Sequence, residues 1–112
     1  MQVRVLHGQT VIGTGLLDHL DPPMGVAFGP FTPSDEYDRA RYANVIDGDY
    51  VGDRGKSLNV WTDSRPLVTS AIAIEDFPAL DEIQLTLFFD EGFIQLFSEH
   101  PDYKAYYAPT KS

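Results

Sequence analysis

Two neighbouring segments of alternating hydrophobicity constrain the fold of this chain more than any other feature of its sequence. Between 67 and 77, one side of the alternation carries Val68, Ser70, Ile72 and Ile74. Between 83 and 89, one side carries Ile83, Leu85, Leu87 and Phe89. A period of two is that of a β-strand with one buried face. The short link between the segments predicts that they pair as antiparallel neighbours and supply the hydrophobic interior.

The N-terminal residues predict a β-hairpin. Residues 2–6 and 10–17 have the composition of strands, and His7-Gly8-Gln9 supplies a turn between them. Gly13 and Gly15 fall on one face of the second strand, where they predict a β-bulge or a close approach of another backbone.

Two more strands are expected further along the chain. In residues 24–31, the large side chains alternate with Gly25, Ala27 and Gly29, so that one face fills a core and the other admits a close neighbour. Residues 58–62 form a short strand that ends in a turn.

Helix signals are found at two places. Thr32-Pro33-Ser34-Asp35 has the order of an N-cap, a first-turn proline and a capping acid, which predicts a short helix that ends near Asp47-Gly48. After Asp90, the spacing of the apolar residues favours a helix, although a hairpin loop at Asp90-Glu91-Gly92 is the alternative.

These elements predict an α+β fold. Its mostly antiparallel sheet has about five to six strands, with one short central helix and a helical C-terminal segment. Residues 1–112 fit the usual size of one domain, in which residues 108–112 form a frayed tail.

Composition excludes several classes of protein. The 112 residues include no cysteine, which removes disulfide scaffolds, thiol nucleophiles and cysteine-ligated metals. The first residues lack the order of a signal peptide and no apolar run reaches transmembrane length, so we expect a cytoplasmic protein.

Net charge indicates the kind of partner. Seventeen acidic residues against eight lysines and arginines give a formal net charge of −9. This charge repels phosphate backbones and anionic membranes, so neither nucleic acid nor membrane is expected as a partner. It favours encounter with a basic protein, although ordinary solubility also selects for such a charge.

The loop at residues 47–57 partly matches two ligand-binding motifs. Read as a calcium loop, it has leucine where the bidentate glutamate belongs; read as a phosphate loop, it lacks the first glycine. No cofactor and no metal site are therefore predicted here.

Two histidine segments, near the two ends of the chain, each place a histidine between acids. The candidate ligand-binding residues are His19 and Asp21 in one segment and His100 and Asp102 in the other. If the segments met in space, they could form a metal site or a general acid/base pair. The alternative is a pair of surface imidazoles bonded near turns.

Aromatic residues offer a further candidate surface. Tyr37, Tyr42 and Tyr50 could grip an extended or apolar ligand, while Phe28 and Trp61 are expected to pack in the core.

Two functional hypotheses remain open. The first is a non-catalytic interaction protein, such as a bacterial immunity or inhibitor protein, that covers a basic partner with an acidic face. Its acids would be Glu75-Asp76, Asp81-Glu82 and Asp90-Glu91. The alternative is a small-ligand or metal-dependent enzyme that uses the two histidine segments, although no catalytic residue is identified. A homo-oligomer is compatible with either.

Overall fold

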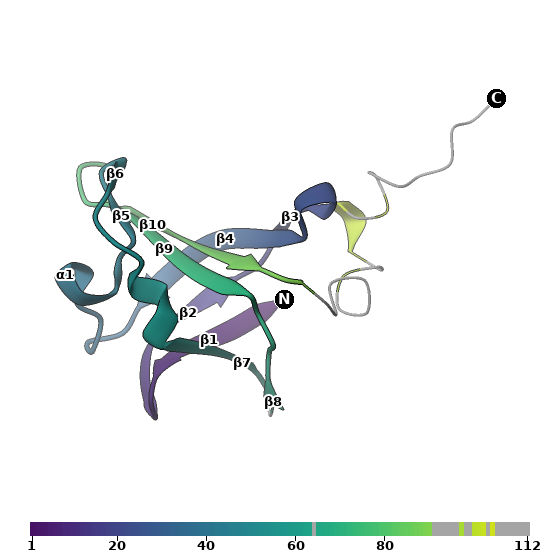
Figure 1. Cartoon of the computed structure of the whole chain (residues 1–112), viewed down its shortest axis with the longest axis horizontal. Helices are drawn as coiled ribbons and strands as arrows, with labels where there is room; N and C mark the ends of the chain where they lie inside the picture. The colour runs from purple at the N-terminus through teal and green to yellow at the C-terminus, as the bar shows by residue number, and fades with distance from the viewer. Residues whose placement is uncertain (64, 91–96, 98–99, 103, 105–112) are drawn as a thin grey trace.

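The computed structural model describes residues 1–63, 65–90, 97, 100–102 and 104. The strands in this part of the chain form one strongly curved, mostly antiparallel sheet (Figure 1). The ten strands in this part of the chain are β1 (Gln2–His7), β2 (Thr10–Leu16), β3 (His19–Asp21), β4 (Val26–Pro33), β5 (Val45–Ile46), β6 (Asp49–Tyr50), β7 (Leu58–Thr62), β8 (Arg65–Pro66), β9 (Ala71–Phe77) and β10 (Glu82–Phe88). Their order in the sheet is β6-β5-β9-β10-β4-β2-β1-β7-β8, and β3 also pairs with β4.

β4 joins the two halves of the sheet. Its first residues pair with β3 on one edge and with β10 on the other, whereas Phe31 to Pro33 pair with β2. Near the other end of the strand order, β7 is preceded by the short 3-10 helix η2 (Arg54–Ser57). A Cβ on Gly55 of η2 would lie 1.8 Å from the carbonyl oxygen of Ile72 in β9. Only glycine therefore allows η2 to lie so close to β9, where the curved sheet comes back toward its beginning.

One continuous hydrophobic core fills the inside of this curve. The alternating residues Ile72, Ile74, Leu85 and Leu87 are buried there, as the sequence pattern predicts. The predicted strand at 67–77 is too long, because β9 begins only at Ala71 and Val68 is 85% exposed. Val3, Val5, Ile12 and Val60 from β1, β2 and β7 complete the opposite wall, and Phe97 joins them through its contact with Phe89. The predicted pairing of β9 with β10 is confirmed, with Leu85 opposite Ile74.

The two glycines of β2 behave as predicted. The register of β1 and β2 shifts after Val5, so that Ile12 is an extra residue, which is a β-bulge. A Cβ on Gly15 would lie 2.4 Å from Cδ2 of Leu85, and one on Gly13 would collide with the ring of Phe31. Both glycines therefore give room to core side chains, Phe31 of β4 and Leu85 of β10.

The predicted helix at residues 32–47 is wrong in extent and in its cap. Thr32 and Pro33 continue β4, because they pair with Thr14 and Gly13 of β2. Between β4 and β5 the chain has only the single α-helical turn α1 (Arg39–Tyr42), capped by Asp38, whose side chain accepts a hydrogen bond from the backbone N–H of Ala40. Strand pairing at Thr32 and again at Val45 confines helical structure to the residues between β4 and β5.

The predicted α+β class is also wrong, because the described chain is mostly sheet. Besides α1, its continuous helical elements are η2 and the short 3-10 helix η1 (Pro22–Met24). Near the C-terminus, four described residues are also α-helical: Phe97, Pro101, Asp102 and Lys104. The strand number was underestimated because β3, β5, β6 and β8 have only two or three residues each, too few to give a periodic signal. Most of the predicted C-terminal helix, and the frayed tail at 108–112, lie outside the described residues. No described helix is long and apolar enough to cross a bilayer.

Leu85 tests the claim that the inner faces of β9 and β10 form the core. Replacement Leu85→Ala should lower the free energy of unfolding by about 2–5 kcal/mol, because it leaves a cavity beneath Gly15. Leu80→Ala is the matched control, since Leu80 is 66% exposed in the β9–β10 turn and should change stability by less than about 0.5 kcal/mol. Chemical denaturation of both variants measures the two changes in the free energy of unfolding. Similar losses of stability in the two variants would refute the assignment of the core.

Candidate functional site

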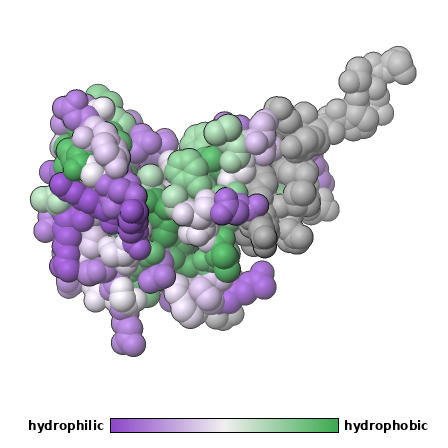
Figure 2. Space-filling view, in the orientation of Figure 1, coloured by the Kyte–Doolittle hydropathy of each residue, from purple (hydrophilic) through white to green (hydrophobic). Residues whose placement is uncertain are grey.

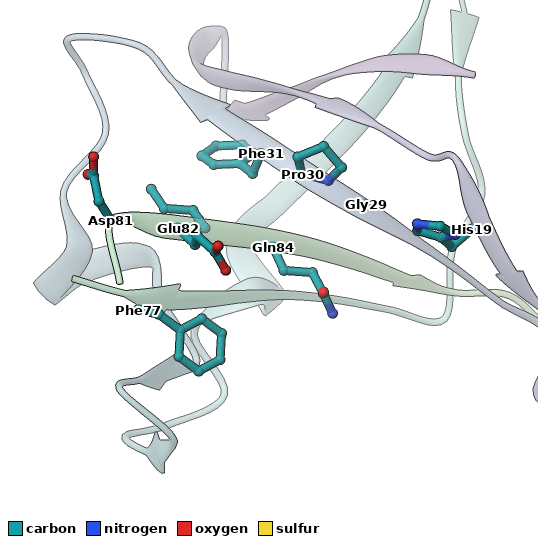
Figure 3. A pocket seen from close by; sticks show the side chains of 9 residues that line it. His19, Gly29, Pro30, Phe31, Phe77, Asp81, Glu82 and Gln84 are labelled. Carbon is teal, nitrogen blue, oxygen red and sulfur yellow. The ribbon is translucent and has the colours of Figure 1, made fainter. Parts of the chain in front are cut away.

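A groove with a volume of about 450 Å³ crosses β4 and β10, and we call it the β4–β10 groove (Figure 3). Its lining residues are His19, Gly29, Pro30, Phe31, Phe77, Asp81, Glu82, Ile83 and Gln84. Figure 3 shows His19 at one end of this row and Asp81 at the other. Neither lysine nor arginine is among the lining residues.

The centre of the groove combines apolar and polar side chains. Pro30 of β4 lies directly opposite Gln84 of β10, and Phe77 of β9 lies opposite Glu82. Phe77 and Ile83 are half-buried, so parts of both side chains remain accessible. Figure 2 shows hydrophobic surface over the middle strands and hydrophilic surface gathered over the end that carries α1, β5 and β6.

The first end of the groove is acidic because of the β9–β10 turn. Asp81 has a positive φ of 55°, a conformation that aspartate tolerates better than most residues. Asp47 holds this turn in place, since its Oδ1 accepts a hydrogen bond from the backbone N–H of Ala79 at 3.1 Å. Within the described chain, neither Asp81 nor Glu82 forms an ion pair, and both are exposed.

At the second end, the structure brings together parts of the two histidine segments. Nδ1 of His19 lies 3.9 Å from Oδ2 of Asp102, and Nε2 of His19 lies 3.7 Å from Oδ1 of Asp18. The Asp102 carboxylate also accepts a hydrogen bond from the backbone N–H of Leu20 at 3.0 Å. Asp102 therefore fastens its segment to β3.

The other members of the histidine segments do not complete a metal centre. His100 uses Nδ1 to accept the backbone N–H of Asp102, and its ring lies edge-on to Phe97. Asp21 is exposed on the same face of β3 as His19, but no ion pair links it to a described residue. Among the described residues, no group of three or more histidines and acids could hold a metal ion.

The three candidate tyrosines have separate environments. Tyr42 is buried at 4% exposure, with its hydroxyl 3.0 Å from Nδ1 of His7. Tyr37 is half-buried between the rings of Phe31 and Tyr42. Tyr50 is 69% exposed on β6, so it alone presents most of its surface to a partner. The three do not form one aromatic platform.

Phe28 and Trp61, both expected in the core, are instead half-buried. Phe28 lies on the face of β4 opposite Ala27, which is fully buried, and its ring stacks at 5.4 Å on that of His19. It therefore belongs to the surroundings of the groove, because the alternation along β4 directs Ala27 and Phe31 into the core.

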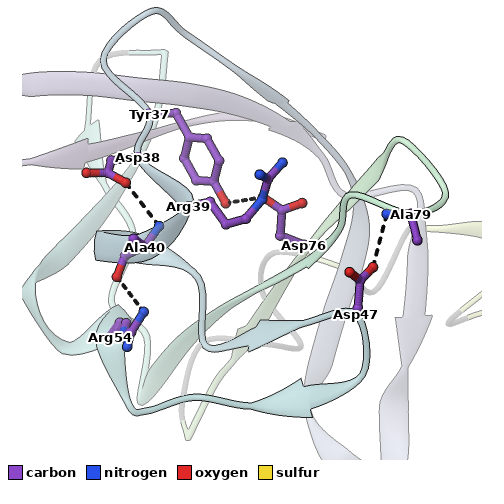
Figure 4. A network of polar contacts seen from close by, with 8 residues as sticks. All are labelled: Tyr37, Asp38, Arg39, Ala40, Asp47, Arg54, Asp76 and Ala79. Carbon is purple, nitrogen blue, oxygen red and sulfur yellow. Dashed lines mark hydrogen bonds and ion pairs between the residues drawn. The ribbon is translucent and has the colours of Figure 1, made fainter.

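A buried carboxylate forms a polar network that sequence reasoning missed (Figure 4). Asp76 is 1% exposed, and its Oδ2 accepts hydrogen bonds from the Tyr37 hydroxyl at 2.7 Å and from Nε of Arg39 at 2.9 Å. The sequence interpretation grouped Asp76 with surface acids. The signal that could have found it is its place in the alternation, because Asp76 shares the buried side of β9 with Ile72 and Ile74.

This network also changes the proton affinity of Tyr37. Burial, followed by the hydrogen bond to the Asp76 carboxylate, raises the pKa of the Tyr37 phenol far above its ordinary value. The hydrogen bond to Asp76 raises the pKa of Arg39 as well. The network therefore ties Tyr37 and the start of α1 to β9 and holds the Tyr37 phenol protonated, which suits a structural role better than proton transfer.

Comparison with known proteins finds no match for this chain among family models, curated proteins or solved structures.

The raised pKa of Tyr37 predicts a loss of stability in alkaline solution. In the unfolded chain the phenol ionises near pH 10, whereas in the folded protein it stays protonated above that value. The contribution of Tyr37 is therefore complete below about pH 10 and is lost as the pH rises beyond it. Denaturation between pH 8 and pH 11, which are about one to two units on either side of the ordinary tyrosine value, should show a steeper fall for the native protein than for Tyr37→Phe. Equal slopes would contradict the prediction.

Proposed function

We propose that the protein is a non-catalytic interaction protein that binds a positively charged segment of another protein in the β4–β10 groove. One observation carries this proposal: the groove places the side chains of Pro30 and Phe77 beside the exposed carboxylate of Glu82, and no lysine or arginine is among the lining residues.

Electrostatics supports a cationic partner. The chain has a net charge of −9, so an approaching basic protein is attracted before contact. Asp81 and Glu82 are exposed and have no ion-pair partner in the described chain. A cationic side chain of a partner therefore need not displace a cationic side chain of this chain. The acid group expected at 75–76 contributes less, because Asp76 is buried and paired with Arg39.

The shape of the groove suits a lysine or arginine side chain. These side chains lay their aliphatic stems on apolar surface while the charged head reaches a polar group. Pro30 and Phe77 offer such a surface beside Glu82, and an aromatic ring also attracts a cation over its face. Tyr50 and Leu80, 69% and 66% exposed at the same end of the sheet, offer further apolar contact.

A pair of short capped peptides tests the proposal. One repeats lysine and leucine, and the other has glutamate in place of every lysine. We expect the basic peptide to bind, with an affinity that falls as salt is added, and the acidic peptide not to bind. Calorimetric titration measures the affinities, and backbone amide NMR shifts should be centred on β4 and β10.

Charge reversal locates the binding. Glu82→Lys should lower the affinity for the basic peptide about tenfold, which is equivalent to about 1.4 kcal/mol of binding free energy. Glu36→Lys changes the net charge equally, but Glu36 is exposed in the loop before α1 and does not line the groove, so affinity should fall much less. Equal weakening by both variants would mean that overall charge, not the groove, attracts the peptide.

The meeting of His19 with Asp102 favours a second candidate function, a small-ligand or metal-dependent enzyme. Zinc is the informative probe, because it prefers four ligands, including neutral imidazole and carboxylate. We expect excess Zn²⁺ to leave the melting temperature unchanged, because the Asp102 carboxylate is already bonded to Leu20. If Zn²⁺ raised the melting temperature of the native protein but not that of His19→Ala, the enzyme hypothesis would be favoured instead.

A further inference from the structure

We propose that the β4–β10 groove recognises arginine in preference to lysine, with Glu82 binding the guanidinium and with Phe77 and Pro30 packing against it. This inference rests on the proposed function and adds which basic side chain the partner must present. Arginine and lysine carry the same charge at neutral pH. The preference therefore depends on the contacts that the groove offers and not on the net charge of the chain.

Glu82 lies between two apolar side chains that come from its two neighbouring strands. Phe77 of β9 is directly opposite Glu82. Pro30 of β4 is directly opposite Gln84, which follows Glu82 by two residues on the same face of β10. Because the strands follow the order β9-β10-β4, Phe77 and Pro30 flank the Glu82 carboxylate from opposite sides, and Figure 3 shows it between the two rings.

The carboxylate and both rings are accessible to a ligand. Glu82 and Pro30 are exposed, Phe77 is half-buried, and all three line the groove. Within the described chain, no lysine or arginine forms an ion pair with Glu82. An incoming cation therefore meets an unpaired carboxylate with an apolar ring on either side.

This combination suits a planar cation better than a compact one. A guanidinium binds a carboxylate through two parallel N–H donors, while its flat faces remain available to stack on neighbouring rings. It is also weakly hydrated, so contact with apolar rings removes little favourable hydration. An ammonium is a strongly hydrated point charge without a flat face, so the same rings would displace its water and replace few of the lost interactions.

Gln84 supplies a further acceptor on the same face of β10. Its Nε2 donates to the Thr86 hydroxyl at 3.4 Å, which leaves the amide oxygen Oε1 to accept a hydrogen bond from a ligand. A guanidinium that is paired with Glu82 still has N–H donors that point away from the carboxylate. The donors of an ammonium all belong to one nitrogen, so one ammonium serves both acceptors less well.

A different protein, rather than a second copy of this chain, is the expected source of the arginine. Several arginines of this chain already donate hydrogen bonds to a carboxylate or to backbone carbonyls within it: Arg4, Arg39 and Arg54. Two copies, each with a net charge of −9, also repel one another. A basic partner has neither obstacle, so we commit to an arginine of a different protein.

Three capped peptides with the same leucines test the preference. The first is the lysine–leucine repeat, the second has arginine in place of every lysine, and the third has citrulline, which is planar like arginine but uncharged. We expect the arginine peptide to bind about fivefold more tightly than the lysine peptide, which is equivalent to about 1 kcal/mol of binding free energy. The citrulline peptide should bind most weakly, because it cannot form an ion pair with Glu82. Calorimetric titration measures the three affinities.

A substitution of Phe77 locates the preference within the groove. Phe77→Leu keeps an apolar side chain but removes the flat ring, so the ratio of the arginine affinity to the lysine affinity should fall from about five to below about two. Tyr50→Leu is the matched control, because it also removes an aromatic ring, whereas Tyr50 is 69% exposed on β6 and does not line the groove. The control should keep the native ratio.

Glu82→Gln tests the other half of the site in a variant that keeps the fold. Because Glu82 is exposed, this variant should retain the native melting temperature even if Phe77→Leu does not. Loss of the carboxylate should weaken the binding of both basic peptides. It should also reduce the arginine preference to below about twofold, because a neutral amide cannot form the paired ionic hydrogen bonds.

The outcomes separate this inference from the proposed function. Equal binding of the lysine and arginine peptides, or a preference that both groove variants leave unchanged, would overturn the arginine preference but leave the proposed function standing. If neither basic peptide binds, both proposals fail. Sedimentation that shows a dimer of the native chain, broken by Glu82→Gln but not by Glu36→Gln, would identify a second copy as the occupant and overturn the inference.

Discussion

The pairing of β4 with other strands on both of its edges is the constraint on which the rest of the structure depends. It joins the β1–β2–β7–β8 half of the sheet to the β9–β10 half. The inner face of β4 carries Ala27 and Phe31 into the core, while its outer face leaves Phe28 and Pro30 accessible beside β10. A single strand therefore closes the hydrophobic interior and supplies one wall of the groove.

The acidic residues of this chain have divided roles, which a net charge does not reveal. Asp76 is buried and binds Tyr37 and Arg39, Asp38 caps α1, and Asp102 fastens its segment to Leu20. Asp81 and Glu82 are exposed at the groove and have no ion-pair partner in the part of the chain that the structure describes. Only carboxylates of this second kind are free to attract a partner.

Local patterns predicted the elements whose residues alternate over a sufficient length. The β1–β2 hairpin, β7 and the β9–β10 pair follow from such alternation, and the glycines of β2 correctly indicated a bulge and a close approach. The helix signal at Thr32-Pro33 failed because strand pairing with β2 outweighs a local cap preference. Tyr37, Tyr42 and Tyr50 were grouped by residue type, yet each has a different environment in the fold.

By itself, the sequence determined the net charge, the absence of thiol chemistry and the apolar buried sides of β9 and β10, because these depend on residue type or on a period of two. Only the tertiary structure decided that Asp102 reaches His19, that Asp76 is buried, and that a groove with apolar and acidic side chains crosses β4 and β10. The physical reason is that these features join residues from distant parts of the chain. Strand register and sheet curvature set the distances between such residues, and neither produces a local pattern in the sequence.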